Sequence, residues 1–402
     1  MSGVVISGDT SGAVTLAVPA VAGTNTVTIP ATTGTAVVMP TGYTLGAGNT
    51  SRFKNRIING DMRIDQRNAG ASLTPTSNGQ YSLDRWSCSL SQASKYSVQQ
   101  NAGSLTPVAT TGFTNYLGIT SLSAYSVNST DFFILRQNIE GLNVADLAWG
   151  TANAKTVTLS FWVYSSLTGT FGGALNNSAE TRSYPFTYSI PIANTWTQIS
   201  ITIAGDTTGT WLTTNGVGIR LNIGLGVGTT NSGTAGSWAG SAYYSATGAV
   251  SVVGTSGATF YITGVQLEVG STASSFEYLD YTTQLSLCQR YYEISYTAGV
   301  KPGTVTDVGM VTLMSTPTGY PNYGVYPSQV NFNTAKRTSA SITIYSNTSG
   351  ASGNYRTTNP ASDYAASVVT NPSTQGFTAY TGANVTNTGS YLYFQWAASA
   401  EL

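Results

Sequence analysis

The sequence contains no histidine, and this absence removes whole classes of chemistry. Histidine is the side chain that titrates near neutral pH and the commonest metal ligand. Serine–histidine–aspartate triads, cysteine–histidine dyads and histidine-based zinc or iron sites are therefore excluded. The chain has only two cysteines, Cys88 and Cys288, which is too few for a disulfide framework in 402 residues. We expect both thiols to be buried among apolar neighbours.

Charged residues are also scarce. They make up 8% of the chain, and 16 Lys and Arg are balanced by 16 Asp and Glu. Nucleic-acid binding needs Lys and Arg clustered on one face, so we expect no nucleic-acid partner. No run of about 18 apolar residues is present, and we expect no membrane insertion. The first residues lack the basic and apolar regions of a secretory signal, which favours assembly in the cytoplasm.

Glycine, threonine and serine are abundant instead, and they separate short runs of β-branched and aromatic residues. Such runs predict strands, with one helical turn around residues 144–147. The clearest covers residues 158–164, where Phe161 and Val163 should face one side and Trp162 and Tyr164 the other. We predict an all-β chain with an antiparallel jelly-roll sandwich over residues 51–280. The other predicted strands of this sandwich cover residues 132–137, 156–165, 197–203, 217–225 and 259–267.

Residues 1–50 contain a short repeat. Pro19 and Gly23, which follow one short strand, recur as Pro30 and Gly34 after a second, 11 residues further on. Strands this short cannot cover their own apolar faces and need neighbouring copies, which threefold intertwining would supply. The alternative is a flexible Gly/Thr-rich leader.

Charge is concentrated at the start of the second region. Residues 52–67 alternate charged residues with isoleucine and methionine, which we interpret as an edge strand with an outward charged face rather than a phosphate site. Residues 81–88 predict another strand, in which Asp84 and Arg85 are possible ion-pair partners.

Within residues 265–292 the spacing of apolar residues changes from that of a strand to that of a helix. The first half of this segment alternates like a last strand, whereas its second half has helical spacing. We predict a connecting helix over residues 281–295, followed by a small C-terminal β-sandwich over residues 296–402.

The chain resembles receptor-binding tail fibres of tailed bacteriophages. The resemblance is carried by residues 30–35, by residues 55–62 with 84–86, by residues 265–270 continuing to 276–277 and 288–292, and by the closing residues 398–402. It implies a virion homotrimer, assembled in the host cytoplasm, whose N-terminal region attaches to tail or baseplate proteins. It also implies a carbohydrate-binding-like jelly roll and a distal C-terminal domain that touches the host. The helical stripe would then pack around the threefold axis, through Tyr281, Leu285, Cys288 and Tyr292.

Two aromatic loops are candidates for binding a host-surface glycan such as lipopolysaccharide. Stiff rings on a braced loop make contact area at small entropic cost. The candidates are Trp238, Tyr243 and Tyr244 in the jelly roll and Tyr320, Tyr323 and Tyr326 in the C-terminal domain. The alternative for each ring is that it folds back onto the sheet.

We expect a non-enzymatic adhesin with no catalytic residue, metal or other cofactor. A purely structural fibre or decoration protein is the second hypothesis. A polysaccharide depolymerase is the third, but it needs two carboxylates about 5–9.5 Å apart. The carboxylates here are few and scattered, and Asp206 has the sequence context of an Asx-turn.

The first prediction concerns assembly. If the N-terminal repeat intertwines three chains, light scattering of the full chain should give three times the chain mass of 41.9 kDa. A stable monomer would remove the physical reason for the repeat.

Overall fold

The computed structural model describes residues 3–7, 13–17, 53–109, 111–314, 328–358, 361–365, 368–380 and 391–402. They belong to two compact units, Met1–Thr44 and Leu45–Leu402. In the first unit, β1 (Gly3–Ser7) pairs antiparallel with β2 (Ala13–Ala17). β2 contains the first strand of the predicted repeat, and the second lies outside the described residues.

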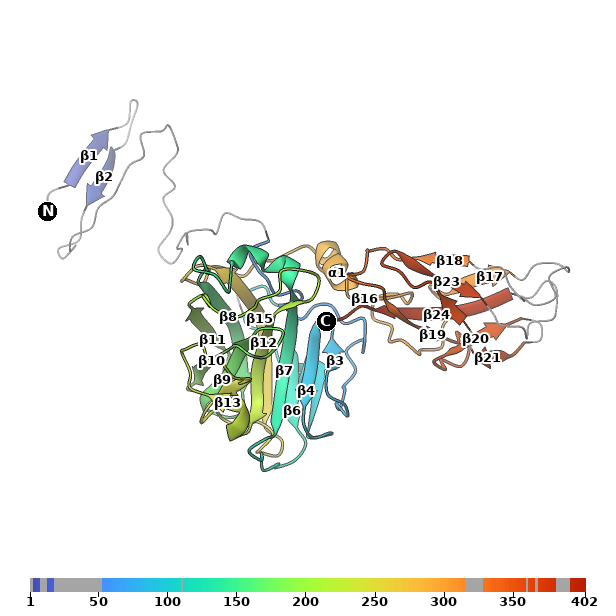
Figure 1. The fold of residues 1–402 in the computed structure, drawn as a ribbon, viewed down its shortest axis with the longest axis horizontal. Coiled ribbons are helices and arrows are strands. Elements are labelled where there is room, and N and C mark those ends of the chain that lie inside the picture. Colours follow the sequence, from blue (N-terminus) through green and yellow to red (C-terminus); the bar gives the residue numbers. More distant parts are fainter. Residues whose placement is uncertain are drawn as a thin grey trace. The chain divides into compact units, whose positions relative to one another are not determined.

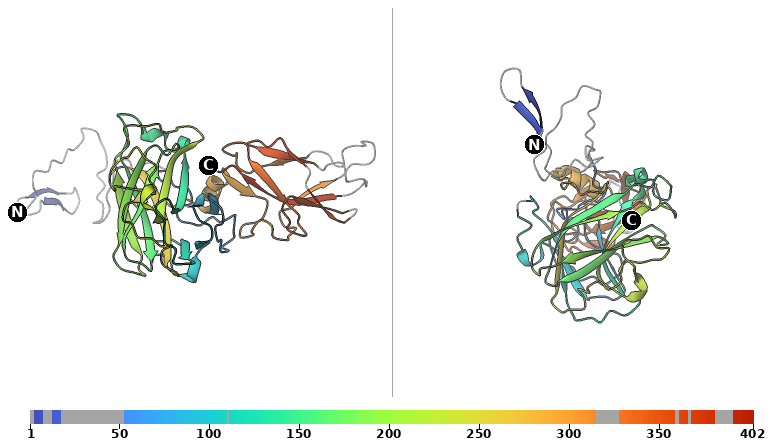
Figure 2. Two further views of the ribbon diagram at one scale, coloured as in Figure 1. Left: turned by 60° about the horizontal axis from the view of Figure 1, so that its bottom comes forward. Right: turned by 90° about the vertical axis from the view of Figure 1, so that its left-hand side faces the viewer.

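The larger unit contains a sandwich of two antiparallel sheets (Figures 1 and 2). The six-stranded sheet has the order β10-β9-β12-β7-β4-β3, and the five-stranded sheet the order β11-β8-β15-β6-β5. Successive strands repeatedly change sheet, as β7, β8 and β9 do, which gives the predicted jelly roll. The strands are β3 (Gln80–Leu83), β4 (Trp86–Leu90), β5 (Tyr96–Gln100), β6 (Leu117–Ser121), β7 (Phe132–Glu140), β8 (Val157–Ser165), β9 (Gly169–Asn176), β10 (Ser183–Ile190), β11 (Thr197–Ile203), β12 (Val217–Val227) and β15 (Thr259–Val269).

The core lies between the two sheets. Phe161 and Val163 of β8 are buried in it, whereas Trp162 and Tyr164 are half-buried on the outer face, as predicted. β8 is an interior strand, and the strands expected from β-branched runs are all present. Short elements join them: η1 (Ala102–Ser104), η2 (Gly141–Asn143), η3 (Ala145–Leu147), η4 (Thr229–Asn231), β13 (Ser232–Gly233) and β14 (Ser245–Ala246).

The prediction of an edge strand over residues 52–67 is wrong. From Phe53 the chain forms turns and irregular backbone, and Ile57, Met62 and Ile64 are buried. The cause is local, because the Asn59 amide donates to the carbonyl of Ile64 (2.8 Å) and accepts from its N–H (3.0 Å). A side chain that satisfies the backbone in this way competes with a strand ladder. We call residues 53–67 the anchor segment.

The anchor segment is bonded to the last strand of the sandwich. Asn55 donates to the carbonyl of Val265 (3.1 Å) and accepts from the N–H of Leu267 (3.1 Å). Gly60 lies so close that a Cβ there would be 2.1 Å from the Val265 carbonyl oxygen. Only glycine therefore fits at this approach.

The single strand expected over residues 81–88 is a hairpin of β3 and β4 instead. Its turn contains Asp84 and Arg85, and Arg85 has a φ of 71°. The two side chains do not pair with each other. Asp84 accepts hydrogen bonds from the backbone and side-chain nitrogens of Gln66 (both 2.7 Å), whereas Arg85 pairs with Glu401.

The predicted connecting helix is α1 (Tyr281–Gln289), and Asp280 caps it by accepting from the N–H of Thr283 (2.9 Å). Cys288 is buried against the anchor segment, and Cys88 is buried in the sandwich core; both are free thiols, as expected. Among the described residues, no helix is long and apolar enough to cross a membrane.

The C-terminal region is a second, smaller β structure around its own core, which includes Phe377, Phe394 and Trp396. Its longest strand, β24 (Tyr391–Ser399), is flanked by several shorter ones. The others are β16 (Tyr292–Ile294), β17 (Val311–Met314), β19 (Ser341–Tyr345), β20 (Asn354–Thr357) and β21 (Asp363–Ala365), with a separate sheet of β18 (Ser328–Asn331), β23 (Gly376–Tyr380) and β22 (Val368–Thr370).

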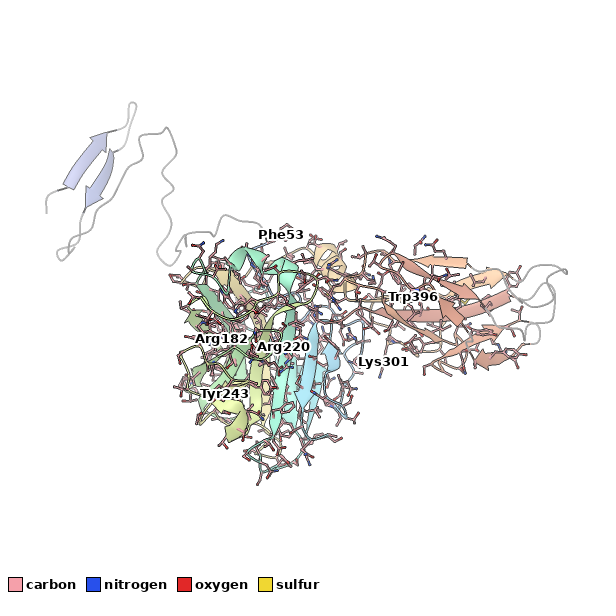
Figure 3. The ribbon with its side chains drawn as sticks, in the orientation of Figure 1. Phe53, Arg182, Arg220, Tyr243, Lys301 and Trp396 are labelled. Carbon is pink, nitrogen blue, oxygen red and sulfur yellow. The ribbon has the colours of Figure 1, made fainter. Side chains whose placement is uncertain are left out.

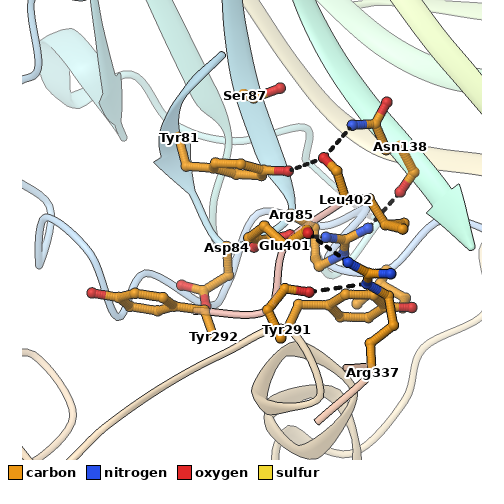
Figure 4. A network of polar contacts seen from close by, with 12 residues as sticks. Tyr81, Asp84, Arg85, Ser87, Asn138, Tyr291, Tyr292, Arg337, Glu401 and Leu402 are labelled. Carbon is orange, nitrogen blue, oxygen red and sulfur yellow. Dashed lines mark hydrogen bonds and ion pairs between the residues drawn. The ribbon is translucent and has the colours of Figure 1, made fainter. Parts of the chain in front are cut away.

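After β24 the last residues return to the sandwich (Figure 4). Glu401 is shared by two arginines, Arg67 of the anchor segment (2.6 Å) and Arg85 of the hairpin. Arg337 holds the backbone there by donating to the Glu401 carbonyl (2.9 Å). We call residues 400–402 the C-terminal tail. Because it bonds to the sandwich, the tail fastens the C-terminal region to it.

We predict that Glu401→Gln destabilises the larger unit by about 3 kcal/mol, because breaking one side of a buried ion pair leaves Arg85 charged and uncompensated. Urea unfolding measures this. Asp146→Asn is the matched control, since Asp146 is 48% exposed in its pair with Arg56 and should cost less than about 1 kcal/mol. Equal effects of the two changes would contradict a special role for Glu401.

A second prediction follows from Asp84. Burial raises the pKa of this carboxyl from 3.8 to about 7, against the opposing influence of Arg67 and Gln66. The folded state therefore holds the proton more tightly than the unfolded state, so stability should fall as pH rises from about 4 to about 7. Asp84→Asn should remove this contribution to the pH dependence of the free energy of unfolding, which urea unfolding measures between about pH 4 and about pH 7. Identical slopes in both proteins would show that Asp84 is already ionised at low pH.

Candidate functional site

Polar side chains gather on the outer face of the six-stranded sheet. Residues alternate across a strand, so Leu135 of β7 and Leu221 of β12 face the core while their neighbours Arg136 and Arg220 face outward. The register places Asn222 of β12 opposite Arg136. It also places Arg220 opposite Asn176 of β9.

A chain of hydrogen bonds joins these side chains across three strands. The Nε of Arg136 donates to the Oδ1 of Asn222 (2.7 Å), whose amide donates to the Oδ1 of Asn176 (2.6 Å). The amide of Asn176 donates in turn to the backbone carbonyl of Tyr243 (3.0 Å). Both asparagines are fully buried, so the network fixes the direction in which Arg136 points.

Glu180 holds the second half of the cluster. One of its oxygens pairs with Arg220 (2.5 Å) and, at 3.6 Å, with Arg136. The other accepts from the hydroxyl of Tyr244 (2.7 Å). Burial, together with this carboxylate, raises the pKa of Tyr244, so its hydroxyl stays a hydrogen-bond donor. We call Arg136, Asn176, Glu180, Arg220, Asn222 and Tyr244 the polar patch.

The long loop after β12 forms one border of the polar patch. It lies on the sheet at Gly172 and Gly224, where a Cβ would come within 2.6 and 2.9 Å of the Ser245 hydroxyl. The loop brings Tyr244 beside Phe132, with ring centroids 5.5 Å apart, and under the guanidinium of Arg136 at 5.4 Å. Figure 3 shows Arg220 and Tyr243 on this part of the sandwich.

The C-terminal tail reaches the same face of the sheet further along. The backbone oxygen of Leu402 accepts from the amide of Asn138 (2.8 Å) and from the hydroxyl of Tyr81 (3.1 Å) (Figure 4). Asn138 is two residues from Arg136 on β7, so both point outward. The loop after β12 therefore borders the polar patch, and the C-terminal tail contacts the same outer face further along β7.

Two buried polar atoms at the polar patch have no hydrogen-bond partner among the described residues. They are the Nε of Arg220 and the hydroxyl of Ser245, which follows Tyr244. Buried polar groups in native proteins normally have a partner, in the protein, in water or in a ligand. Both atoms lie beneath the surface of the polar patch, where the loop covers the sheet.

The structure separates the predicted glycan-binding aromatics. Tyr243 and Tyr244 reach the polar patch, although the ring of Tyr243 packs against Gly233. Trp238 does not reach it, because it folds back against Trp149 (5.3 Å) and Trp211 (5.4 Å) and donates to the carbonyl of Ala204. Tyr320, Tyr323 and Tyr326 lie outside the described residues.

The predicted axis stripe is not a single surface. Cys288 is fully buried within the chain, and Tyr292 is buried on β16, so neither can face another copy as expected. The cause is that the anchor segment and the C-terminal region already cover them. Tyr281 is 47% exposed, and Leu285 is half-buried beside it on α1. Contact of these two residues with other copies stays a prediction.

The sequence reasoning missed Arg136, Arg220 and the two asparagines. One signal was available, because β7 and β12 both contain arginine and asparagine two residues apart, at Arg136 with Asn138 and at Arg220 with Asn222. Within an otherwise apolar strand, that spacing puts both polar groups on one outer face. Glu180 carries no such signal, since it lies in a turn with a φ of 55°.

Asp206, the carboxylate considered for catalysis, is engaged in structural contacts. It accepts two hydrogen bonds from Arg182 (2.7 and 2.8 Å) and one from the N–H of Thr208 (3.2 Å). The last bond is the expected Asx-turn. These contacts leave Asp206 as a turn residue.

No family model and no curated protein matches the sequence. Among solved structures, the chain is similar to the enzymatically active domain of tailspike protein 4 of bacteriophage CBA120, at 13% identity and a TM-score of 0.30. That similarity covers 54% of this chain and 21% of the tailspike. A putative sugar binding protein from Bacteroides thetaiotaomicron gives 11% identity and a TM-score of 0.30 over 54% of this chain and 99% of that one. A family 11 carbohydrate-binding module from Clostridium thermocellum gives 11% identity and a TM-score of 0.24, over 50% of this chain and 96% of that module. The function is therefore inferred from the side chains of this chain.

Proposed function

We propose that the chain is a non-enzymatic phage adhesin whose jelly roll binds a host-surface glycan at the polar patch. The observation that carries the proposal is the bonded network of Arg136, Asn222 and Asn176 on an outer sheet face beside Tyr244. Such a network orients donors before a ligand arrives, which lowers the entropy lost on binding.

The chemistry of the polar patch suits a glycan. Guanidinium and amide groups bond sugar hydroxyls or acidic sugars, while the half-buried ring of Tyr244 offers an apolar surface to a sugar ring. The polar patch has two guanidinium groups and one carboxylate, so it favours a neutral or anionic glycan such as lipopolysaccharide. Several such sites on one particle would add avidity to weak individual contacts.

The virion role rests on the resemblance to tail fibres. In this proposal the protein is a homotrimer in the virion, and residues 1–50 attach it to tail or baseplate proteins. The paired strands β1 and β2 are consistent with that role, because a two-stranded hairpin is marginal alone and gains from neighbouring copies. A purely structural fibre remains the competing proposal, and it requires the polar patch to be covered in the assembled particle.

The test is a screen of bacterial surface polysaccharides on an array with the full chain. We expect at least one glycan to bind, and we expect Arg220→Gln and Tyr244→Ala each to weaken its binding at least tenfold, because each removes one of the partners that Glu180 holds in the polar patch. Arg56→Gln is the matched control, since Arg56 and Arg220 are both 20% exposed and ion-paired.

Three outcomes would count against the proposal. Binding that is equally strong in all three variants would place the glycan elsewhere. An array with no binder would favour the structural fibre, and release of reducing sugar from a bound polysaccharide would instead favour an enzyme.

A further inference from the structure

A concave site separate from the polar patch lies where α1 meets the sandwich and the C-terminal region. It is a pocket of about 240 Å³. α1 contributes Tyr281, Leu285 and Gln289, which lie on one helical face because they are four residues apart. The rest of the lining comes from the anchor segment and the residues after it, from Gln100 at the end of β5, and from residues 294–299.

The charged groups of the pocket already have hydrogen-bonding or ion-pair partners within the chain. Asp65 accepts from the backbone N–H groups of Arg67 (3.1 Å), Asn68 (2.8 Å) and Gly70 (2.7 Å). Arg63 is paired with Asp61 and donates to the carbonyl of Leu279 (2.7 Å). A ligand therefore needs no charge to match this pocket, and an ion would gain little from it.

Neutral polar atoms in the lining are free. The hydroxyl of Tyr281 and the amide nitrogen of Gln289 have no hydrogen-bond partner among the described residues. Gln100 donates its amide nitrogen to the carbonyl of Met62 (2.6 Å), but its amide oxygen accepts from none of the described residues. The set offers one donor, one acceptor and one hydroxyl that does both.

Apolar walls complete the site. Ile64 and Ile294 are buried in the lining, and Leu285 lies between the polar residues of α1. At roughly 30 Å³ for each liquid water, the pocket has the volume of about eight waters. That is room for one sugar ring, and it is smaller than the roughly 300–1,000 Å³ of sites for drug-sized ligands.

We propose that this pocket binds a single uncharged sugar unit, with Tyr281, Gln289 and Gln100 bonding its hydroxyls and the aliphatic walls covering its C–H face. The ligand class rests on the proposed glycan function, but the site shares no residue with the polar patch. The fibre would then bind a glycan at two places, which raises avidity without a stronger contact at either.

The test uses the full chain and four sugars offered singly at millimolar concentration: glucose, galactose, N-acetylglucosamine and rhamnose. We expect saturation-transfer NMR to detect at least one of them. Tyr281→Ala and Gln289→Leu should each weaken the binding of that sugar at least tenfold. Ala298→Trp, which places a large ring at the exposed lip, should abolish the signal. Arg56→Gln, which changes neither the pocket lining nor the polar patch, should leave it unchanged.

Four results would overturn the proposal. One is the absence of transfer to all four sugars, and another is a signal that survives Ala298→Trp. The third is a lower assembly mass for Tyr281→Ala with an unchanged sugar signal, which would assign this face to contact between copies. Loss of the signal in Arg220→Gln alone would place the sugar on the polar patch, and so would support the proposed function while rejecting the pocket.

Discussion

The carboxylate of Glu401 is the contact on which the arrangement of the larger unit depends. The Glu401 side chain is 8% exposed, and it is shared by Arg67 from the start of that unit and Arg85 from the first hairpin of the sandwich. The guanidinium of Arg85 also lies 3.6 Å from the ring centre of Tyr291, next to α1. Three buried charges in one place are expensive unless all are satisfied, so none of these segments can move independently.

Several of the described stretches that carry the resemblance to tail fibres are bonded to one another. Asn55 bonds to β15 at Val265 and Leu267, and the carbonyl of Asn59 accepts from the indole of Trp86 (3.0 Å). The closing residues supply Glu401. These residues are therefore explained by packing and hydrogen bonding between segments far apart in the sequence. They describe how the sandwich and the C-terminal region are joined, and they say little about the ligand.

The strands of the sandwich could be predicted because burial imposes a period of two on them. β11 has the predicted bounds, and β8 has the predicted faces, since Phe161 and Val163 enter the core. The anchor segment could not be predicted in this way. Its alternating pattern matches a strand, but Asn59 and Met62 adopt positive φ values, and side chains rather than a ladder satisfy the backbone. The turn at Arg85 gave no signal either, because no glycine marks its positive φ.

The candidate site was predictable only in part, for a related reason. A long loop rich in aromatics pointed to Tyr243 and Tyr244, and both lie at the polar patch. Trp238 belongs to the same loop but gains more by packing against Trp149 and Trp211. Whether a ring faces a ligand or the core depends on tertiary neighbours, which the loop sequence does not contain.

The polar patch and the pocket are supported by the same buried framework. Leu402 bonds to Asn138 on β7, the strand that also carries Arg136, while α1 presents Tyr281 and packs through Cys288 onto the anchor segment. Both surfaces are thus held by segments that meet at Glu401. A ligand at the polar patch meets side chains oriented by contacts made in its absence, so little ordering entropy is lost on binding. For the adhesin proposed above this framework matters, because weak sites add up only when the scaffold between them holds their geometry fixed.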